Sequence, residues 1–193
     1  MTDVGTAANV GDRPMRADAR RNHDRLVEAA RTVFAARGSD ASIEEIARTA
    51  DVGVGTLYRH FPRRIDLVEA VYREGVDALV AQGDQLVTAA EPGAALTCWL
   101  EAFVAYAAAK RTFLTELHEA FEKCPDLAVS SRERIGVATG RLLARAQEAG
   151  VVRPDIGQRE LMQLVGGMCM ARATTVEQNL DLLAFILDGI RAR

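Results

Sequence analysis

The stretch from Ser42 to Phe61 constrains the fold more than any other part of the chain. Its sequence, SIEEIARTADVGVGTLYRHF, predicts two short helices joined by a tight turn. Ser42 can cap the first helix, and Glu45, three residues later, completes a capping box. Asp51 and Gly53 both suit the left-handed backbone conformation of a tight turn. We therefore expect a helix-turn-helix.

Apolar spacing gives each of these helices an inward face and an outward face. The inward residues of the first helix are Ile43, Ile46, Ala47 and Ala50. Leu57 and Phe61, four residues apart, anchor the second helix in the core, and Pro62 ends it. The residues left facing outward on the second helix are Gly55, Thr56, Tyr58, Arg59 and His60.

The outward residues have the chemistry that DNA recognition requires. Arg59 can donate to O6 and N7 of guanine, and the Thr56 methyl can touch a thymine methyl. Gly55 and Ser42 can present backbone amides to a phosphate. Contacts that fix register without reading sequence are expected from Tyr58, His60 and Arg64. The alternative is a helical hairpin inside another all-helical protein, with an ordinary solvated face.

The run from about Arg20 to Tyr72 resembles the N-terminal domain of the tetracycline-repressor (TetR) family of bacterial transcriptional regulators. The matching residues are Ala29, Ala30, Phe34, Arg37, Gly38, Ser42 to Ala47, Val52, Gly55 to Phe61, Arg64, Leu67 and Val71. The resemblance implies an all-α protein of about nine helices. An N-terminal three-helix domain would bind DNA, and a C-terminal helical domain would bind a ligand and dimerise.

The chain departs from the family pattern at the turn. Asp51 stands where many members have Gly, and an Asp can hold that turn at modest cost. Gly53 and Val54 begin the second helix, where members often carry a polar pair such as Ser-Lys. We therefore expect Gly53 and Val54 to lie at the DNA with fewer phosphate or base contacts than that pair would make.

Helical patterns continue to the end of the chain, without strand alternation or an internal repeat. Residues 1–16 lack periodicity and predict a disordered arm, whose arginines either contact DNA or are merely solvated. A DNA-binding domain is expected at 17–65 and a ligand-binding and dimerisation domain at 66–193. The helices expected outside the turn motif are 17–37, 66–89, 94–110, 112–123, 130–149, 158–174 and 176–192.

The net charge of the whole chain is −3, which does not favour DNA binding, but the charge is distributed unevenly along the sequence. Residues 13–64 carry 11 basic and 7 acidic side chains, which gives +4. Residues 65–193 carry 13 basic and 18 acidic side chains, which gives −5, and Asp3 and Asp12 supply the rest. Positive charge is therefore concentrated in the expected DNA-binding domain.

No apolar run is long enough to span a membrane, and the N-terminus lacks an apolar signal region. A cytoplasmic protein without a membrane partner is expected. The chain also lacks a nucleophile-base pair, a phosphate-cradling loop and a metal cluster, so we expect neither an enzyme nor a cofactor. Cys98, Cys124 and Cys169 show no metal-ligand spacing and are interpreted as core thiols, with a redox sensor as the alternative.

The last two expected helices are more apolar than a surface helix needs. A helix that is apolar nearly all round must be buried on two sides, and one side can face a second subunit. Pairing two such helices with their copies gives a four-helix interface across a two-fold axis. A central core helix of a monomer is the alternative. The interface residues expected are Leu161, Leu164, Val165, Met168, Leu183, Ile186, Leu187 and Ile190.

A homodimer would place two DNA-reading helices about one helical turn apart, which suits a palindromic operator on double-stranded DNA. The family resemblance also implies a small-molecule effector in the C-terminal domain. The residues expected to line its pocket are Trp99, Phe103, Tyr106, Phe113, Leu117, Phe121, Met162, Cys169 and Met170. An ordinary core would show the same pattern. A DNA-binding adaptor for a protein partner and a helical enzyme are the alternatives.

Overall fold

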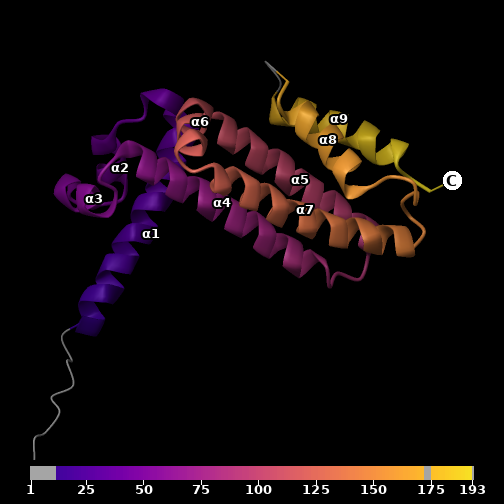
Figure 1. The fold of residues 1–193 in the computed structure, drawn as a ribbon, viewed down its shortest axis with the longest axis horizontal. Helices are drawn as coiled ribbons and strands as arrows, with labels where there is room; N and C mark the ends of the chain where they lie inside the picture. Colours follow the sequence, from indigo (N-terminus) through magenta and orange to yellow (C-terminus); the bar gives the residue numbers. More distant parts are fainter. Residues whose placement is uncertain (1–11, 172–174, 193) are drawn as a thin grey trace, which may run out of the picture. The chain divides into compact units, whose positions relative to one another are not determined.

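The computed structural model describes residues 12–171 and 175–192, and the side chains from residue 17 onward. Within these ranges the chain is all-α, as predicted, with nine α-helices and one short 3₁₀ turn (Figure 1). The helices are α1 (Asp12–Arg37), α2 (Ile43–Thr49), α3 (Val54–His60), α4 (Arg64–Leu86), α5 (Pro92–Arg111), α6 (Leu114–Lys123), α7 (Pro125–Glu148), α8 (Gln158–Cys169) and α9 (Val176–Gly189). The 3₁₀ turn is Gly38–Asp40.

The chain divides into two compact units, an N-terminal unit (Met1–Leu67) and a C-terminal unit (Val68–Arg193). In the N-terminal unit α1 packs against α2, and α2 packs against α3. Its fully buried large side chains come from all of these helices and from the start of α4, because each helix has one apolar face. They are Leu26, Phe34, Ile46, Leu57 and Leu67.

In the C-terminal unit α5 is the central helix and packs against α7, α8 and α9. Trp99 of α5 is fully buried, and its indole Nε1 donates to Thr139 Oγ1 at 3.0 Å. Gly83 of α4 makes room for this ring, because an added Cβ would lie 2.8 Å from it. The indole is therefore enclosed on both sides by the packing of α4 and α7.

Three helix boundaries differ more than the others from the sequence predictions. α1 begins at Asp12 rather than at residue 17, so the part of the predicted arm that the structure describes is helical. The rest of that arm, residues 1–11, lies outside the described residues. α7 begins at Pro125 rather than at residue 130, because a proline fits the first helical position and stops only the preceding helix. α8 ends at Cys169 rather than at residue 174.

The start of α9 is fixed by a capping box that the sequence analysis missed. Thr175 Oγ1 accepts a hydrogen bond from the Gln178 amide at 3.2 Å, and Gln178 Oε1 accepts one from the Thr175 amide at 3.0 Å. The T-x-x-Q spacing is the signal that could have shown it.

Among the described residues, no helix combines the length and the apolar character that a bilayer crossing requires. The same part of the chain brings together no group of three or more His, Cys, Asp or Glu that could hold a metal ion.

Candidate nucleic-acid interface

Ser42 caps α2 as the sequence predicts. Its Oγ accepts a hydrogen bond from the Glu45 amide at 3.0 Å, which satisfies one of the free donors at the helix start. The other half of the predicted capping box is replaced by an ion pair, since Glu45 Oε1 faces Arg37 Nε of α1 at 3.6 Å. The start of α2 is thereby tied to the end of α1.

The turn between α2 and α3 is held by Asp51. Its φ of +52° is the left-handed conformation, whereas Gly53 is extended with φ −63° and ψ 140° and caps α3. The prediction that both residues suit the left-handed region is thus correct for Asp51 alone. Arg25 of α1 stabilises the turn, because its Nη2 lies 3.0 Å from Asp51 Oδ2 and 3.4 Å from the Asp51 carbonyl oxygen.

Two buried residues fix which side of α3 faces solvent. Leu57 is fully buried and Phe61, at the helix end, is nearly so. Tyr58 is 47% exposed, and Arg59 beside it is also exposed. Arg59 makes no hydrogen bond or ion pair with any residue that the structure describes, so its guanidinium is available to a ligand.

The other predicted contact residues on α3 fall into two groups. Gly53, Val54 and Gly55 are exposed at the helix start, while Thr56 and His60 are half-buried. A Cβ added at Gly55 would meet nothing within 4 Å, so packing within the protein does not explain a glycine there. Its small size is then free to serve a close approach by another molecule. The His60 ring lies edge-on to His23 of α1, with centroids 6.2 Å apart.

Arg64, which the sequence predicts to contact a phosphate, also helps to hold the N-terminal unit together. Its guanidinium donates from Nη1 to the Ala41 carbonyl oxygen and from Nη2 to the Ser39 carbonyl oxygen, the latter at 3.4 Å. It also lies over the Phe34 ring, with Cζ 5.1 Å from the centroid. The side chain therefore ties α4 to α1 and to the loop before α2.

Replacing Arg64 with alanine is expected to destabilise the N-terminal unit by roughly 1–3 kcal/mol, because charged hydrogen bonds and a cation-π contact are lost. Thermal unfolding followed by circular dichroism measures this effect. Arg48→Ala, at an exposed arginine without a described partner, is the matched control and should leave the melting temperature nearly unchanged. A wild-type melting temperature in Arg64→Ala would contradict the structural role.

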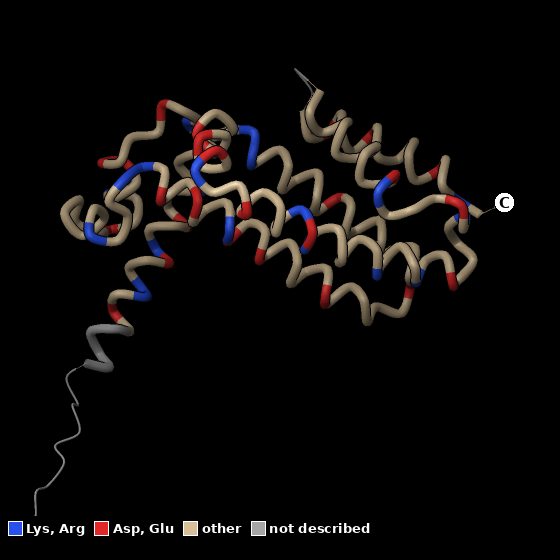
Figure 2. The backbone as a smooth tube through the Cα atoms, viewed as in Figure 1, with Lys and Arg blue, Asp and Glu red and all other residues tan. Residues whose placement is uncertain are grey.

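Several arginine side chains of the N-terminal unit have no ion-pair partner among the described residues. Basic positions recur along α1 and the α2–α3 segment, interspersed with acidic ones (Figure 2). Some arginines are paired within the unit, such as Arg21 with Asp18. Arg20, Arg48 and Arg59 have no ion-pair partner among the described residues. The excess positive charge that the sequence shows is therefore presented by side chains without an internal counter-ion.

The residues predicted to line an effector pocket do not all come together. Tyr106 and Phe121 lie against Tyr72 of α4, with ring centroids 6.5 Å and 5.2 Å from it, and Phe103 lies against Tyr106 at 6.2 Å. Tyr72 was not among the predicted pocket residues, although it continues the apolar face of α4 with Val68. The remaining predicted residues lie elsewhere: Trp99, Phe113, Leu117 and Cys169 are buried, Met162 is half-buried beside Thr139, and Met170 is exposed.

Polar groups accompany this aromatic cluster of Tyr72, Phe103, Tyr106 and Phe121. The Tyr106 hydroxyl is buried, and no described residue gives it a hydrogen bond of ordinary geometry. Burial, aided by the neighbouring Tyr72 phenol, raises the pKa of Tyr106 far above its usual range. Lys110 Nζ lies 6.0 Å from the Tyr106 ring centroid, and burial together with Arg132 lowers the pKa of Lys110. Tyr106 therefore stays a neutral hydrogen-bond donor.

Four of the predicted interface residues belong to the core of the C-terminal unit, which corrects that prediction. They are Leu161, Val165, Leu183 and Ile190, all buried within the protomer. Helices α8 and α9 contact α5 and each other, and the four buried side chains therefore offer little surface to another chain. Ile190 is the one of the four that also borders a groove. Leu164 is 52% exposed, and Met168, Ile186 and Leu187 are half-buried. Leu180, Leu182 and Phe185, omitted from the prediction, are also exposed.

Comparison with known proteins covers both units. Residues 26–71 match the family model described as bacterial regulatory proteins of the tetR family. Residues 91–192 match the model described as the C-terminal domain of SbtR-like transcriptional regulators.

Two solved structures are similar along most of the chain. A TetR transcriptional regulator from Streptomyces coelicolor is 35% identical, with a TM-score of 0.78 over 88% of this chain and 98% of that one. A TetR regulatory protein from Mycobacterium vanbaalenii is 34% identical, with a TM-score of 0.72 over 93% and 100%. An HTH-type transcriptional regulator of Staphylococcus aureus is 36% identical over 73 residues, 37% of this chain and 40% of that relative.

Proposed function

Because the chain belongs to the TetR family of DNA-binding transcriptional regulators, we propose that it represses transcription as a homodimer. The dimer binds a palindromic operator through α3 of each protomer, and a small molecule bound in the C-terminal unit releases it. Binding chromosomal DNA requires that the protein act in the cytoplasm.

The observation that carries the DNA-binding proposal is the exposed face of α3. Tyr58 and Arg59 project from a helix that Leu57 and Phe61 anchor, and the Asp51 turn fixes its angle to α2. A helix held in this way can enter a major groove, where arginine reads guanine by two parallel hydrogen bonds. The Tyr58 hydroxyl donates a hydrogen bond to a phosphate and so fixes the position of α3 on the DNA. Gly55, without a side chain, lets the start of α3 approach the DNA backbone closely.

The homodimer is supported by the distribution of exposed apolar side chains. Six of the eleven large hydrophobic side chains that are exposed in the described residues lie between Leu164 and Phe185. Exposed apolar side chains gathered on two helices that contact each other are typical of an interaction surface. Two copies joined there across a two-fold axis would present two α3 helices to one palindrome.

Fluorescence anisotropy with DNA fragments tiled across the upstream region of the protein's own gene tests the DNA-binding proposal. Tight binding to one palindromic fragment, weakening steeply as salt rises, is expected because phosphate contacts release counter-ions. Weak and equal binding to every fragment would contradict sequence-specific recognition at that region. Selecting bound fragments from a pool of random-sequence DNA would then show whether the protein prefers another sequence.

The aromatic cluster is the place that we propose for the effector. Phe103, Phe121 and Tyr72 offer an apolar surface, and the buried Tyr106 hydroxyl makes no hydrogen bond of ordinary geometry with a described residue. A buried donor without a partner is destabilising, and a ligand with an acceptor atom would satisfy it. The effector would favour a spacing of the two α3 helices that no longer fits the operator. α4 would transmit the change, since it begins in the N-terminal unit and continues through the C-terminal unit.

Replacing Tyr106 with phenylalanine is expected to leave operator affinity unchanged and to raise the effector concentration needed for release about 5- to 30-fold. The reason is the loss of one hydrogen bond from a buried hydroxyl, roughly 1–2 kcal/mol. Titrating an effector found by a release screen into the protein–operator complex measures it. An unchanged midpoint in Tyr106→Phe would place the effector away from Tyr106.

A further inference from the structure

One face of α8 and α9 carries a protruding aromatic ring. Phe185 of α9 is 73% exposed, more than any other large hydrophobic residue that the structure describes. Leu182, one turn before it, is also exposed, and Leu164 of α8 is 52% exposed. A phenylalanine with this much exposure is unfavourable unless another molecule covers it.

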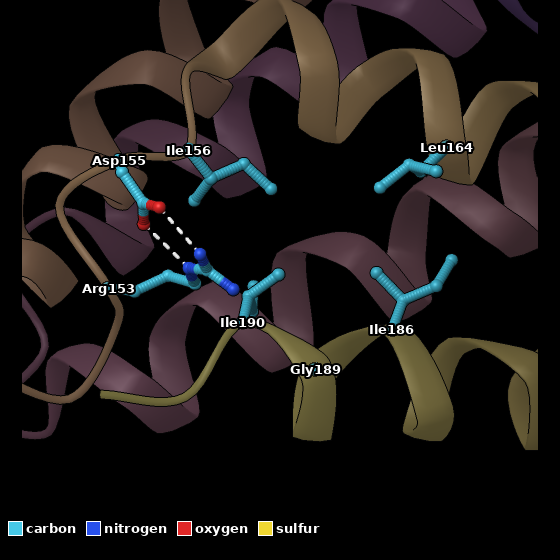
Figure 3. Close-up of a pocket in the computed structure, with 7 residues that line it drawn as sticks. All are labelled: Arg153, Asp155, Ile156, Leu164, Ile186, Gly189 and Ile190. Atoms are coloured by element: carbon cyan, nitrogen blue, oxygen red, sulfur yellow. Dashed lines mark hydrogen bonds and ion pairs between the residues drawn. The ribbon is translucent and has the colours of Figure 1, made fainter. Parts of the chain in front are cut away.

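The same pair of helices borders an open groove of about 340 Å³ (Figure 3). Ile156 and Leu164 line one side of the groove, and Ile186, Gly189 and Ile190 line the other. Arg153 and Asp155 form a bidentate ion pair at one end, with Nε–Oδ1 and Nη2–Oδ2 distances of 2.5 Å. The groove is therefore apolar along its length and charged at its end.

Hydrogen bonds within the protomer hold the loop that forms the charged end of the groove. Gln147 Nε2 of α7 donates to the carbonyl oxygens of Arg153 at 3.0 Å and Ile156 at 2.9 Å. The Arg153 amide donates to the Ile190 carbonyl oxygen at 2.9 Å, which joins the loop after α7 to the end of α9. Because the walls are fixed in the protomer, an inserted side chain loses little free energy to reorganisation.

We infer that Phe185 of each protomer inserts into this groove on a second copy of the chain. The inference rests on the proposed homodimer and adds the contact that specifies it. Phe185 and Gly189 are four residues apart on α9, so the ring and the groove share one face of the helix. A face that carries both a projection and a matching hollow is self-complementary, which a two-fold interface requires.

The sizes agree with this arrangement. An aromatic ring fits a cavity of roughly 150 Å³, so the groove holds a phenyl ring with space for the backbone that carries it. Burying a phenylalanine covers on the order of 150–250 Å², against roughly 800 Å² on each partner in a stable interface. Two symmetric insertions therefore supply a sizeable share of the area, and the other exposed residues of α8 and α9 supply the remainder.

Two single substitutions test the contact from its opposite sides. Phe185→Ala removes the projection, and Gly189→Leu fills the groove. A Cβ at Gly189 meets nothing within 4 Å, so the position has room for the start of a side chain. Each is expected to raise the dimer dissociation constant at least about 100-fold in sedimentation velocity, with an unchanged circular dichroism spectrum. Val137→Ala, at an exposed apolar residue of α7, is the control and should dimerise as the wild type does.

Mixing the two variants identifies the contact as one between protomers. A heterodimer retains one insertion, of the Phe185 from the Gly189→Leu protomer into the open groove of the Phe185→Ala protomer. Its other contact pairs an alanine with a filled groove, which removes the clash. Native mass spectrometry of an equimolar mixture should therefore show heterodimer well above the share that random pairing gives.

The outcomes separate this inference from the proposed function. A dimeric wild type whose two variants dimerise equally well would overturn the Phe185 contact and leave the homodimer intact. Variants that dissociate but do not form the heterodimer would also overturn it, since Phe185 would then contact something other than the groove. A monomeric wild type at all concentrations would refute the homodimer itself.

Discussion

Arg59→Ala is expected to lower the operator affinity of the dimer by roughly 2–6 kcal/mol, because each half-site loses a base contact of about 1–3 kcal/mol. Arg59 is exposed on α3 and has no partner among the described residues, so its removal leaves the protomer fold unchanged. The loss should also relax the preference at one base position in each half-site. Binding to a set of operators with single base changes measures both effects.

Arg48→Ala provides the matched comparison, since Arg48 is another exposed arginine of the helix-turn-helix. It should weaken binding by a similar amount on every sequence and reduce the steepness of the salt dependence. If Arg59→Ala behaved in the same way as Arg48→Ala, Arg59 would be a phosphate contact and α3 would read sequence by other means.

Trp99→Ala is expected to destabilise the C-terminal unit by roughly 3–5 kcal/mol, because it removes a fully buried aromatic side chain and leaves a cavity. The indole hydrogen bond to Thr139 is lost as well. Urea unfolding followed by circular dichroism is the appropriate measurement, since Trp99 is the only tryptophan and its fluorescence disappears with it.

Trp99→Phe serves as the intermediate variant. It keeps an aromatic ring against Gly83 and loses only the hydrogen bond and part of the volume, so its destabilisation should be smaller. A Trp99→Ala protein of wild-type stability that no longer responds to an effector would show that Trp99 lines the effector site. That result would contradict the structural role assigned here.

The helix-turn-helix is the part of the fold that the sequence predicts best. Its signals are local: the Ser42 cap, the turn at Asp51 and the buried pair Leu57 and Phe61 all lie within one stretch. The spacing of apolar residues then decides which side of α3 is exposed. The structure adds Arg25, whose contact with the turn joins residues far apart in sequence.

Arg64 has a structural role that its local sequence does not predict. Its sequence position, just after the helix-turn-helix, suits a phosphate contact. Its partners are the carbonyl oxygens of Ser39 and Ala41 and the ring of Phe34, and nothing in a linear pattern identifies carbonyl acceptors. Only the folded N-terminal unit brings these groups together.

The apolar helices α8 and α9 show a second limit. An apolar position on such a helix can face its own core or another subunit, and the periodicity is the same for both. Leu161 and Leu183 belong to the core, whereas Leu164 and Phe185 are exposed. The distinction depends on the placement of α5 beside them, which arises from contacts distant in sequence.

A hydroxyl-radical footprint of the protein on its operator shows whether two α3 helices read adjacent major grooves, as we propose. We expect two protected segments related by the operator dyad, centred about one helical turn or somewhat more apart on one side of the DNA. Guanine methylation within each segment should interfere with binding by the wild type, and not with the residual binding of Arg59→Ala. A single protected segment, or uniform protection without symmetry, would show that the dimer does not place two α3 helices in adjacent major grooves.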